Sequence, residues 1–73
     1  MKNYGISYKG NVEVGYKNLK EAKKDALYYM ETFGLISCSI FSYQSELSYQ
    51  AEKAAEIGEV LLDAKEVERV YND

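Results

Sequence analysis

The feature that most constrains this sequence is an alternation of polarity near its start. Between residues 4 and 16 large apolar side chains occupy even positions, and small or charged side chains occupy odd ones. A period of two is typical of a strand with one buried face. Because the apolar set stays even on both sides of Gly10, paired residues must have an even sum, which excludes a two-residue turn. We therefore expect two antiparallel strands joined by the three-residue loop Lys9, Gly10 and Asn11. The expected pairs are Tyr8 with Val12, Ile6 with Val14 and Tyr4 with Tyr16.

A helix is predicted between Asn18 and Gly34. Asn18 followed by Glu21 is a capping pair, and Gly34 suits the left-handed stop of a helix. Between them the apolar residues are three or four apart, which is helical spacing. These apolar positions are Leu19, Ala22, Ala26, Tyr29 or Met30, and Phe33.

Residues 35–44 return to an extended pattern and predict a third strand. Because a strand-helix-strand connection is right-handed and parallel, the third strand runs parallel to the second, with room between them for the first. This gives the order 2-1-3. We expect the helix to cover the face that carries Ile6, Val14, Ile36 and Ile40, with Cys38 on the same side.

A second helix is expected to begin near Glu46, where apolar residues again follow helical spacing. If it continued to the end, Val67, Val70 and Tyr71 would fall opposite the apolar stripe, so a break is expected at Gly58 or Asp63. A short strand at residues 60–62 is an alternative. The expectation is one α+β domain over residues 1–73, with a three-stranded antiparallel sheet, two helices and the order ββαβα.

The composition excludes several classes of function. The 73 residues include no His, which removes the commonest general base and the usual catalytic zinc ligand. No cofactor-binding or metal-binding motif occurs, so we expect neither a cofactor nor an enzyme. Cys38 is the single cysteine, which favours a reducing, cytoplasmic setting and a structural role in the core. No long apolar run or export signal is present, so no membrane association is expected.

Charge is distributed unevenly along the chain. Residues 1–36 hold six Lys against four acids, a net of +2, whereas residues 37–73 hold three basic residues against eight acids, a net of −5. General nucleic-acid binders are usually basic overall, because phosphate contacts supply most of their affinity. Direct nucleic-acid binding is therefore not expected.

Five acidic residues in the second half are spaced by three or four positions: Glu52, Glu56, Glu59, Asp63 and Glu66. On an unbroken helix they would form a single column. One interpretation is a solvated face opposite the apolar stripe. The other is a surface that binds a basic partner, including the nucleic-acid channel of an enzyme that acts on DNA or RNA. The column stays in one row only if the helix continues through Asp63.

The sheet face away from the first helix is a second candidate site. It would present small residues beside Phe41 and Tyr43, which makes a flat, partly apolar platform. Three interpretations are open: the C-terminal helix covers it, a partner or a second copy of the chain binds it, or it stacks nucleic-acid bases.

Tyrosine is the third feature, with eight residues in 73. Tyrosine is enriched in protein interfaces because its ring gives a large contact area and its hydroxyl a hydrogen bond. The alternative is half-buried strand edges in a small domain. The candidates for partial exposure are Tyr4, Tyr8, Tyr28, Tyr43 and Tyr49.

In size and composition the chain resembles the small acidic inhibitors that phages and other mobile elements make against host enzymes, including anti-CRISPR proteins. The resemblance involves no shared motif. It implies a protein that binds a host enzyme stoichiometrically at a basic or nucleic-acid-binding surface, and a homodimer is also expected. The expected partner-binding residues are Glu52, Glu56, Glu59, Asp63, Phe41 and Tyr43. The alternatives are a binder of single-stranded nucleic acid that uses the open sheet face and a structural homodimer module.

Overall fold

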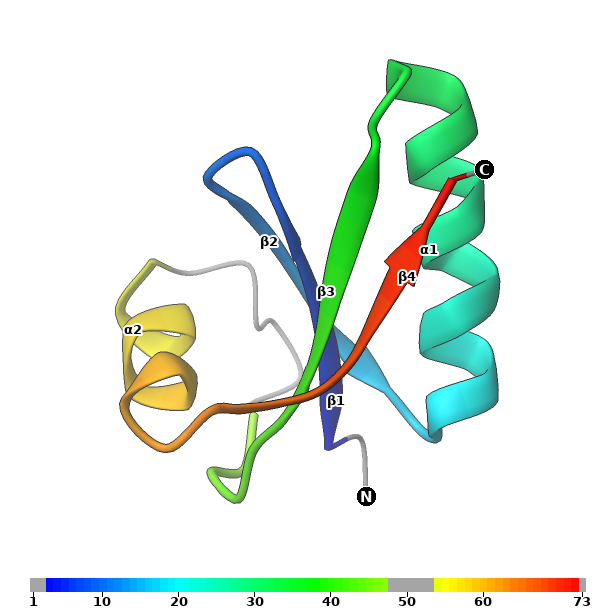
Figure 1. The fold of residues 1–73 in the computed structure, drawn as a ribbon. Helices are drawn as coiled ribbons and strands as arrows, with labels where there is room; N and C mark the ends of the chain where they lie inside the picture. The colour runs from blue at the N-terminus through cyan, green and yellow to red at the C-terminus, as the bar shows by residue number, and fades with distance from the viewer. Residues whose placement is uncertain (1–2, 48–53, 73) are drawn as a thin grey trace.

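A computed structural model describes residues 3–47 and 54–72 of the chain. Its strands form one antiparallel sheet in the order β2-β1-β3-β4 (Figure 1). The α+β class and the order 2-1-3 of the first three strands are confirmed. The expectation of only three strands is wrong, because a fourth strand pairs with β3. The elements are β1 (Tyr4–Tyr8), β2 (Asn11–Tyr16), α1 (Leu19–Phe33), β3 (Ser37–Ser42), α2 (Ala54–Leu62) and β4 (Lys65–Tyr71).

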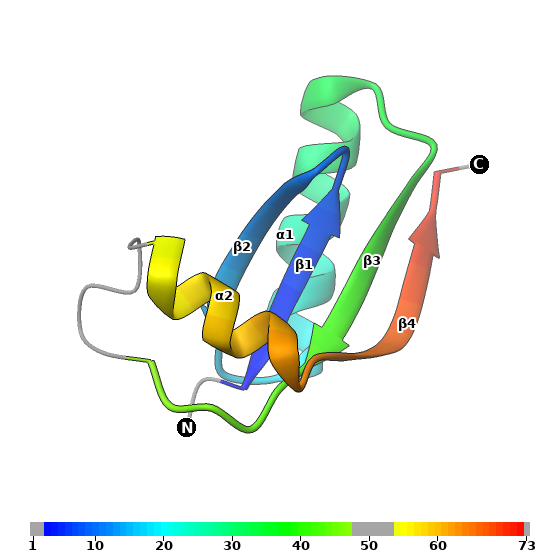
Figure 2. The same ribbon diagram turned by 90° about the vertical axis from the view of Figure 1, so that its left-hand side faces the viewer.

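The two helices lie on opposite faces of the sheet. Helix α1 runs along one face, and α2 packs near one end of the other face (Figures 1 and 2). We call these the α1 face and the α2 face. Within residues 3–47 and 54–72, the sheet is therefore covered along its length by α1 and only in part by α2.

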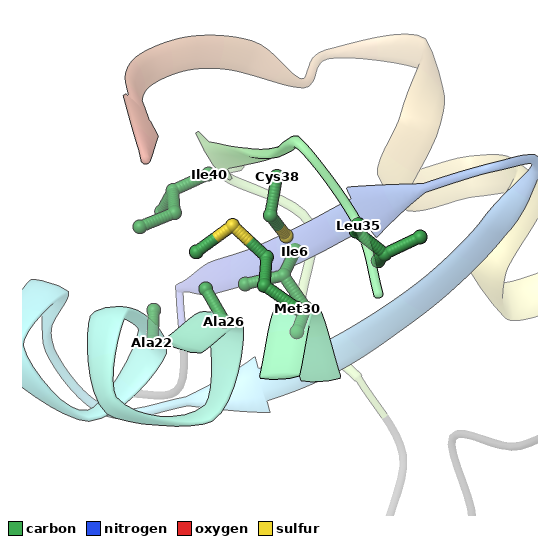
Figure 3. Close-up of a cluster of buried hydrophobic side chains, with 7 residues drawn as sticks. All are labelled: Ile6, Ala22, Ala26, Met30, Leu35, Cys38 and Ile40. Carbon is green, nitrogen blue, oxygen red and sulfur yellow. The ribbon is translucent and has the colours of Figure 1, made fainter. Parts of the chain in front are cut away.

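The main core lies between α1 and the sheet (Figure 3). As predicted, Cys38 and Ile40 of β3 face α1 and are buried. Ile36 does not join them and is 81% exposed, because it precedes β3 in the link from α1. The buried residues of this core are Ile6, Ala22, Ala26, Met30, Leu35, Cys38 and Ile40.

The ends of α1 match the sequence prediction. The Asn18 side chain accepts a hydrogen bond from the backbone N–H of Glu21 at 2.9 Å, which satisfies one of the free donors at the helix start. Gly34 ends the helix in the left-handed conformation, with φ of 65°. The Leu35 amide then bonds to the Met30 carbonyl at 2.9 Å, and Leu35 is buried against the helix.

The hairpin between β1 and β2 differs from the prediction. Tyr8 pairs with Asn11, so the turn has two residues, Lys9 and Gly10, both with positive φ (43° and 79°). Two-residue turns with positive φ match the right-handed twist of the flanking strands, whereas two-residue turns with negative φ would splay the strands. The expected three-residue loop is therefore wrong, although the expected pair of Tyr4 with Tyr16 is observed.

A bulge at Gly15 allows the two-residue turn and the pair of Tyr4 with Tyr16 to occur in the same hairpin. Gly15 has φ of 98° and is the extra residue between the pairs of Tyr4 with Tyr16 and of Gly5 with Val14. Between the turn and this bulge, β2 is shifted by one position relative to the prediction. Because side chains alternate across a strand, Val12 and Val14 lie on the α2 face instead of the α1 face.

Those two valines belong to a second, smaller core. Phe41, Tyr43 and Val60 are buried together, with Val12 and Val14 packed against them. Phe41 and Tyr43 therefore do not form an open platform. The C-terminal helix covers these residues and supplies Val60. Cover by this helix was one of the three interpretations of the sequence.

Helix α2 ends at Leu62, so Asp63 and not Gly58 marks the break. The expected start near Glu46 is not observed, because Glu46 and Leu47 are not helical, and residues 48–53 lie outside the described part. The Asp63 carboxylate accepts hydrogen bonds from the Gln44 amide at 3.2 Å and from the Ser45 hydroxyl at 3.0 Å. Asp63 thus ties the end of α2 to the segment that follows β3.

Strand β4 was hidden in the sequence by its charges and by a second bulge. Val67 is an extra residue between the pairs of Ile40 with Glu68 and of Phe41 with Glu66. The bulge interrupts the alternation that would indicate a strand. The only signal was that Val67 and Val70 did not fit the helical stripe.

Candidate protein-binding surface

Four aromatic side chains gather where the β1–β2 hairpin meets the second half of α1. Tyr8 stacks on Tyr29 with ring centroids 5.2 Å apart and on Phe33 at 6.0 Å. Tyr29 and Phe33 are stacked at 6.0 Å, and Tyr28 meets Tyr29 edge to face at 5.5 Å. We call Tyr8, Tyr28, Tyr29 and Phe33 the aromatic surface.

Local structure explains why these rings meet. Tyr29 and Phe33 are four residues apart and therefore lie one turn apart on the same flank of α1. Tyr8 points to the α1 face, like Ile6 two residues before it, and so reaches that flank. The three rings pack as a layer that continues the main core outward.

This layer is open to solvent at its outer side. Phe33 is 56% exposed and Tyr28 is 62% exposed, whereas Tyr8 and Tyr29 are partly buried. Phe33 is the last residue of α1, so no further helical turn covers it. Exposed aromatic rings that already contact one another can bind a partner with little loss of side-chain entropy.

A cavity of about 370 Å³ borders the aromatic surface. It lies between the hairpin turn and the end of α1, and its lining includes the rings of Tyr8 and Phe33. The cavity is large enough for one apolar or aromatic side chain of a partner. Its lining residues are Tyr8, Lys9, Asn11, Phe33 and Leu35.

The phenols of Tyr8 and Tyr29 remain neutral at ordinary pH. Burial raises the pKa of Tyr8 and of Tyr29, and the nearby Glu13 carboxylate adds to the rise in both cases. A neutral phenol can donate or accept a hydrogen bond, as in the rims of protein interfaces.

Part of this surface was predicted from the sequence and part was not. Tyr8 and Tyr28 were candidates for exposure, whereas Phe33 was assigned to the buried stripe of α1, and Tyr29 was an alternative to Met30 in that stripe. The available signal was the spacing of four between Tyr29 and Phe33, which places two rings together on a helix. What the sequence did not reveal was that Tyr8 would join them.

The acidic column is not a single row in the structure. Glu52 lies outside the described residues, while Glu56 and Glu59 lie on α2. Asp63 follows the end of α2, and Glu66 belongs to β4. Because the helix ends at Leu62, the column expected on a continuous helix does not extend to Asp63 and Glu66.

Glu66 is already engaged within the chain. It accepts hydrogen bonds from the Ser39 hydroxyl and from the Arg69 guanidinium, the latter at 2.7 Å. The Ser39 hydrogen bond and then the Arg69 charge lower the pKa of this carboxyl. Of the two members of the set on the described part of α2, Glu59 is exposed and Glu56 is partly buried.

The uncovered part of the α2 face holds a shallow polar pocket of about 410 Å³. Its lining includes Ser7, Ser37, Ser39 and Arg69. Arg69 is engaged with Glu66, and its guanidinium lies 3.4 Å from the Ser37 hydroxyl. The two aromatic rings on which base stacking depended, Phe41 and Tyr43, are buried under α2 and do not reach this pocket.

Neither a metal centre nor a reactive thiol is found in the described part of the chain. Residues 3–47 and 54–72 hold no cluster of ligands suited to a metal ion. In the same ranges no helix has the length and apolar character to span a membrane. Cys38 is buried, its thiol donates to the Ser7 carbonyl at 3.6 Å, and burial raises its pKa.

Comparison with known protein families, with curated proteins and with solved structures found no match. Functional interpretation therefore depends on the geometry of the chain.

Proposed function

We propose that this chain is a small non-enzymatic domain that binds another protein through the aromatic surface. The observation that carries the proposal is the stack of Tyr8, Tyr29 and Phe33 beside a cavity that can hold one side chain. Aromatic residues in preformed clusters supply most of the binding energy in many interfaces. The sequence contains no histidine and no metal-binding motif, which supports binding rather than catalysis.

The surface favours a partner that inserts an apolar side chain. Leu35 and the rings of Tyr8 and Phe33 give the cavity an apolar wall, and Lys9 and Asn11 border it with polar groups. An aromatic or branched aliphatic side chain of the partner would contact the apolar wall. A carbonyl or carboxylate near that side chain would bind the polar groups of Lys9 and Asn11. We propose such a side chain as the main contact.

The acidic second half has a separate role in this proposal. Residues 37–73 carry a net charge of −5, from three basic and eight acidic residues. Such a field attracts a partner with a basic surface and raises the association rate more than the final affinity. The size and composition suggest a stoichiometric inhibitor of a host enzyme. Such an inhibitor would use its negative charge to speed association with the enzyme and its aromatic rings to stabilise the complex.

The test starts from a partner that co-purifies with the chain and is then reconstituted with it. Replacing Phe33 with Ser should weaken binding about tenfold or more, because it removes the exposed wall of the cavity. Leu62→Ser is the matched control, since Leu62 is also apolar and is 88% exposed on α2. Circular dichroism shows that each variant is folded, and titration calorimetry gives its affinity.

A third variant separates the two roles. Glu59→Lys should slow association at low salt and leave the dissociation rate nearly unchanged. Equal loss of affinity in the Leu62 and Phe33 variants would overturn the aromatic surface as the binding site. A large increase in the dissociation rate for Glu59→Lys alone would place the contact on α2 instead.

A further inference from the structure

The outer edge of β4 has unpaired backbone groups at defined residues. Within the described part of the chain, β4 has a hydrogen-bonded neighbour on its β3 side only. The Asn72 amide donates to the Ile36 carbonyl at 2.9 Å, so Asn72 faces β3. In an antiparallel ladder alternate residues face the same neighbour, so Val70 also bonds toward β3. The N–H and C=O groups of Arg69 and Tyr71 therefore point outward.

Side chains of this segment alternate between the two faces of the sheet. Val70 packs against the main core on the α1 face. Glu68 lies on the same face, where its carboxylate is 2.7 Å from the Lys23 amine of α1. Arg69 and Tyr71 lie on the α2 face, and Tyr71 is 63% exposed.

Residues 68–72 form the regular part of this edge. The bulge at Val67 ends the regular ladder on one side. The other sheet edge, β2, is interrupted by the bulge at Gly15. Bulges hinder strand addition, so the segment after Val67 is the better template for another strand.

Charge decides how a second copy could pair with this segment. Antiparallel pairing about a two-fold axis at Glu68 would oppose two Glu68 carboxylates, and an axis at Arg69 would oppose two guanidinium groups. Like charges directly opposite one another are destabilising. An axis at Tyr71 overlaps only residues 70–72 of the described chain. An axis at Val70 uses all of residues 68–72 and opposes no like charges.

The register centred on Val70 also places complementary groups together. Val70 lies opposite Val70 of the second copy on the α1 face. Arg69 lies opposite Tyr71 of the second copy on the α2 face, where the guanidinium can contact the ring. Because Arg69 and Tyr71 have the outward backbone groups, this register forms about four new backbone hydrogen bonds.

We propose that two copies of this chain join through antiparallel pairing of β4 about a two-fold axis at Val70. The two sheets then form one continuous sheet, with both α1 helices on the same side. This pairing leaves the aromatic surface free and does not depend on the proposed partner binding.

Opposite charges at position 71 test the register. Tyr71→Glu would place a carboxylate opposite Arg69 of the second copy and should tighten the dimer about tenfold, because the contact occurs twice. Tyr71→Lys would oppose two cations and should weaken the dimer by a similar factor. Sedimentation equilibrium over the micromolar range, at low salt, gives the dissociation constants.

A crosslink tests the axis directly. In a Cys38→Ala background, Val70→Cys would place two thiols at a non-hydrogen-bonded antiparallel pair, where the close Cα atoms suit a disulfide. Mild oxidation should give a covalent dimer. Leu62→Cys, at an exposed site away from β4, is the control and should not crosslink at the same rate. A parent chain that stays monomeric over this range overturns the proposal, as does a dimer that responds equally to Glu and Lys at position 71.

Discussion

The Phe41 ring lies directly over Gly5 on the α2 face of the sheet. The two residues are Cα partners across β1 and β3. A Cβ on Gly5 would lie 2.8 Å from Cε2 of Phe41 and 2.8 Å from the Glu13 carbonyl oxygen. Both distances are shorter than van der Waals contact. The missing side chain of Gly5 is therefore what lets the Phe41 ring pack against the β1 backbone and reach the second core.

Gly5→Ala should destabilise the protein by about 1 to 3 kcal/mol, because the new methyl group must displace the Phe41 ring or the β2 backbone. Urea unfolding, followed by circular dichroism, measures the change. A stability equal to that of the parent would contradict the tight packing of Phe41 on β1.

Gly58→Ala is the matched control and should have the opposite sign. A Cβ at Gly58 of α2 meets no atom within 4 Å. Alanine in the interior of a helix is favoured over glycine by roughly 0.5 to 1 kcal/mol. The same unfolding measurement should therefore show a gain, and a loss would mean that α2 needs a glycine at this position.

Tyr43→Phe should destabilise the protein by about 1 to 2 kcal/mol. The Tyr43 hydroxyl accepts a hydrogen bond from the Gly15 amide at 3.1 Å, at the bulge of β2. Without it, a partly buried N–H group loses its partner. Hydrogen exchange of the Gly15 amide should become faster. Tyr28→Phe, at an exposed ring, should stay within about 0.5 kcal/mol of the parent.

Cys38 should react slowly with thiol reagents in the folded protein. Its side chain is buried against α1, and burial raises its pKa, so little thiolate is present at neutral pH. Cys38→Ala should cost about 1 to 2 kcal/mol through lost packing and leave partner binding unchanged. Labelling at the same rate in folded and urea-unfolded protein would contradict this placement.

The free energy of unfolding should fall as pH rises above about 10. Burial, followed by a hydrogen bond to the Asp25 carboxylate, raises the pKa of Tyr16 well above its ordinary value. Below the unfolded-state pKa both states are protonated and the stabilisation is complete. Above it the unfolded state ionises first, so stability is lost until the folded-state pKa is reached.

Tyr16→Phe isolates this contribution. The variant should lose stability less steeply with pH than the parent between about pH 9 and pH 11, because its ring cannot ionise in the unfolded state. Urea midpoints measured across this range decide the matter, and parallel curves for the parent and Tyr16→Phe would refute the assignment.

Local signals in the sequence were sufficient for the ends of α1 and for its buried residues Ala22 and Ala26, but not for Phe33, which is exposed. Asn18, Gly34 and the spacing of three and four act within one helix, where each interaction joins residues close in sequence. The same reasoning identified Asp63 as a possible end of the second helix. It also placed Cys38 and Ile40 on the buried side of β3.

The register of the hairpin depended on interactions that the alternation alone does not contain. Even spacing on both sides of Gly10 predicted a three-residue loop, but a two-residue turn with a bulge at Gly15 fits the same sequence. Packing of Val12 and Val14 against Phe41 favours the second arrangement. Sequence periodicity cannot distinguish a wider turn from a compensating bulge, because both restore the same parity.

The sequence by itself determined the α+β class, the first three strands, helix α1 and the position of its core, because these follow from periodicity and caps. Only the tertiary structure decided that β4 pairs with β3, that α2 buries Phe41 and Tyr43, and that Tyr8 meets Tyr29 and Phe33. Each of these contacts joins segments distant in sequence. Their formation depends on which side chains of each strand lie on the α1 face and which lie on the α2 face. A shift of one residue at a bulge moves those side chains to the opposite face.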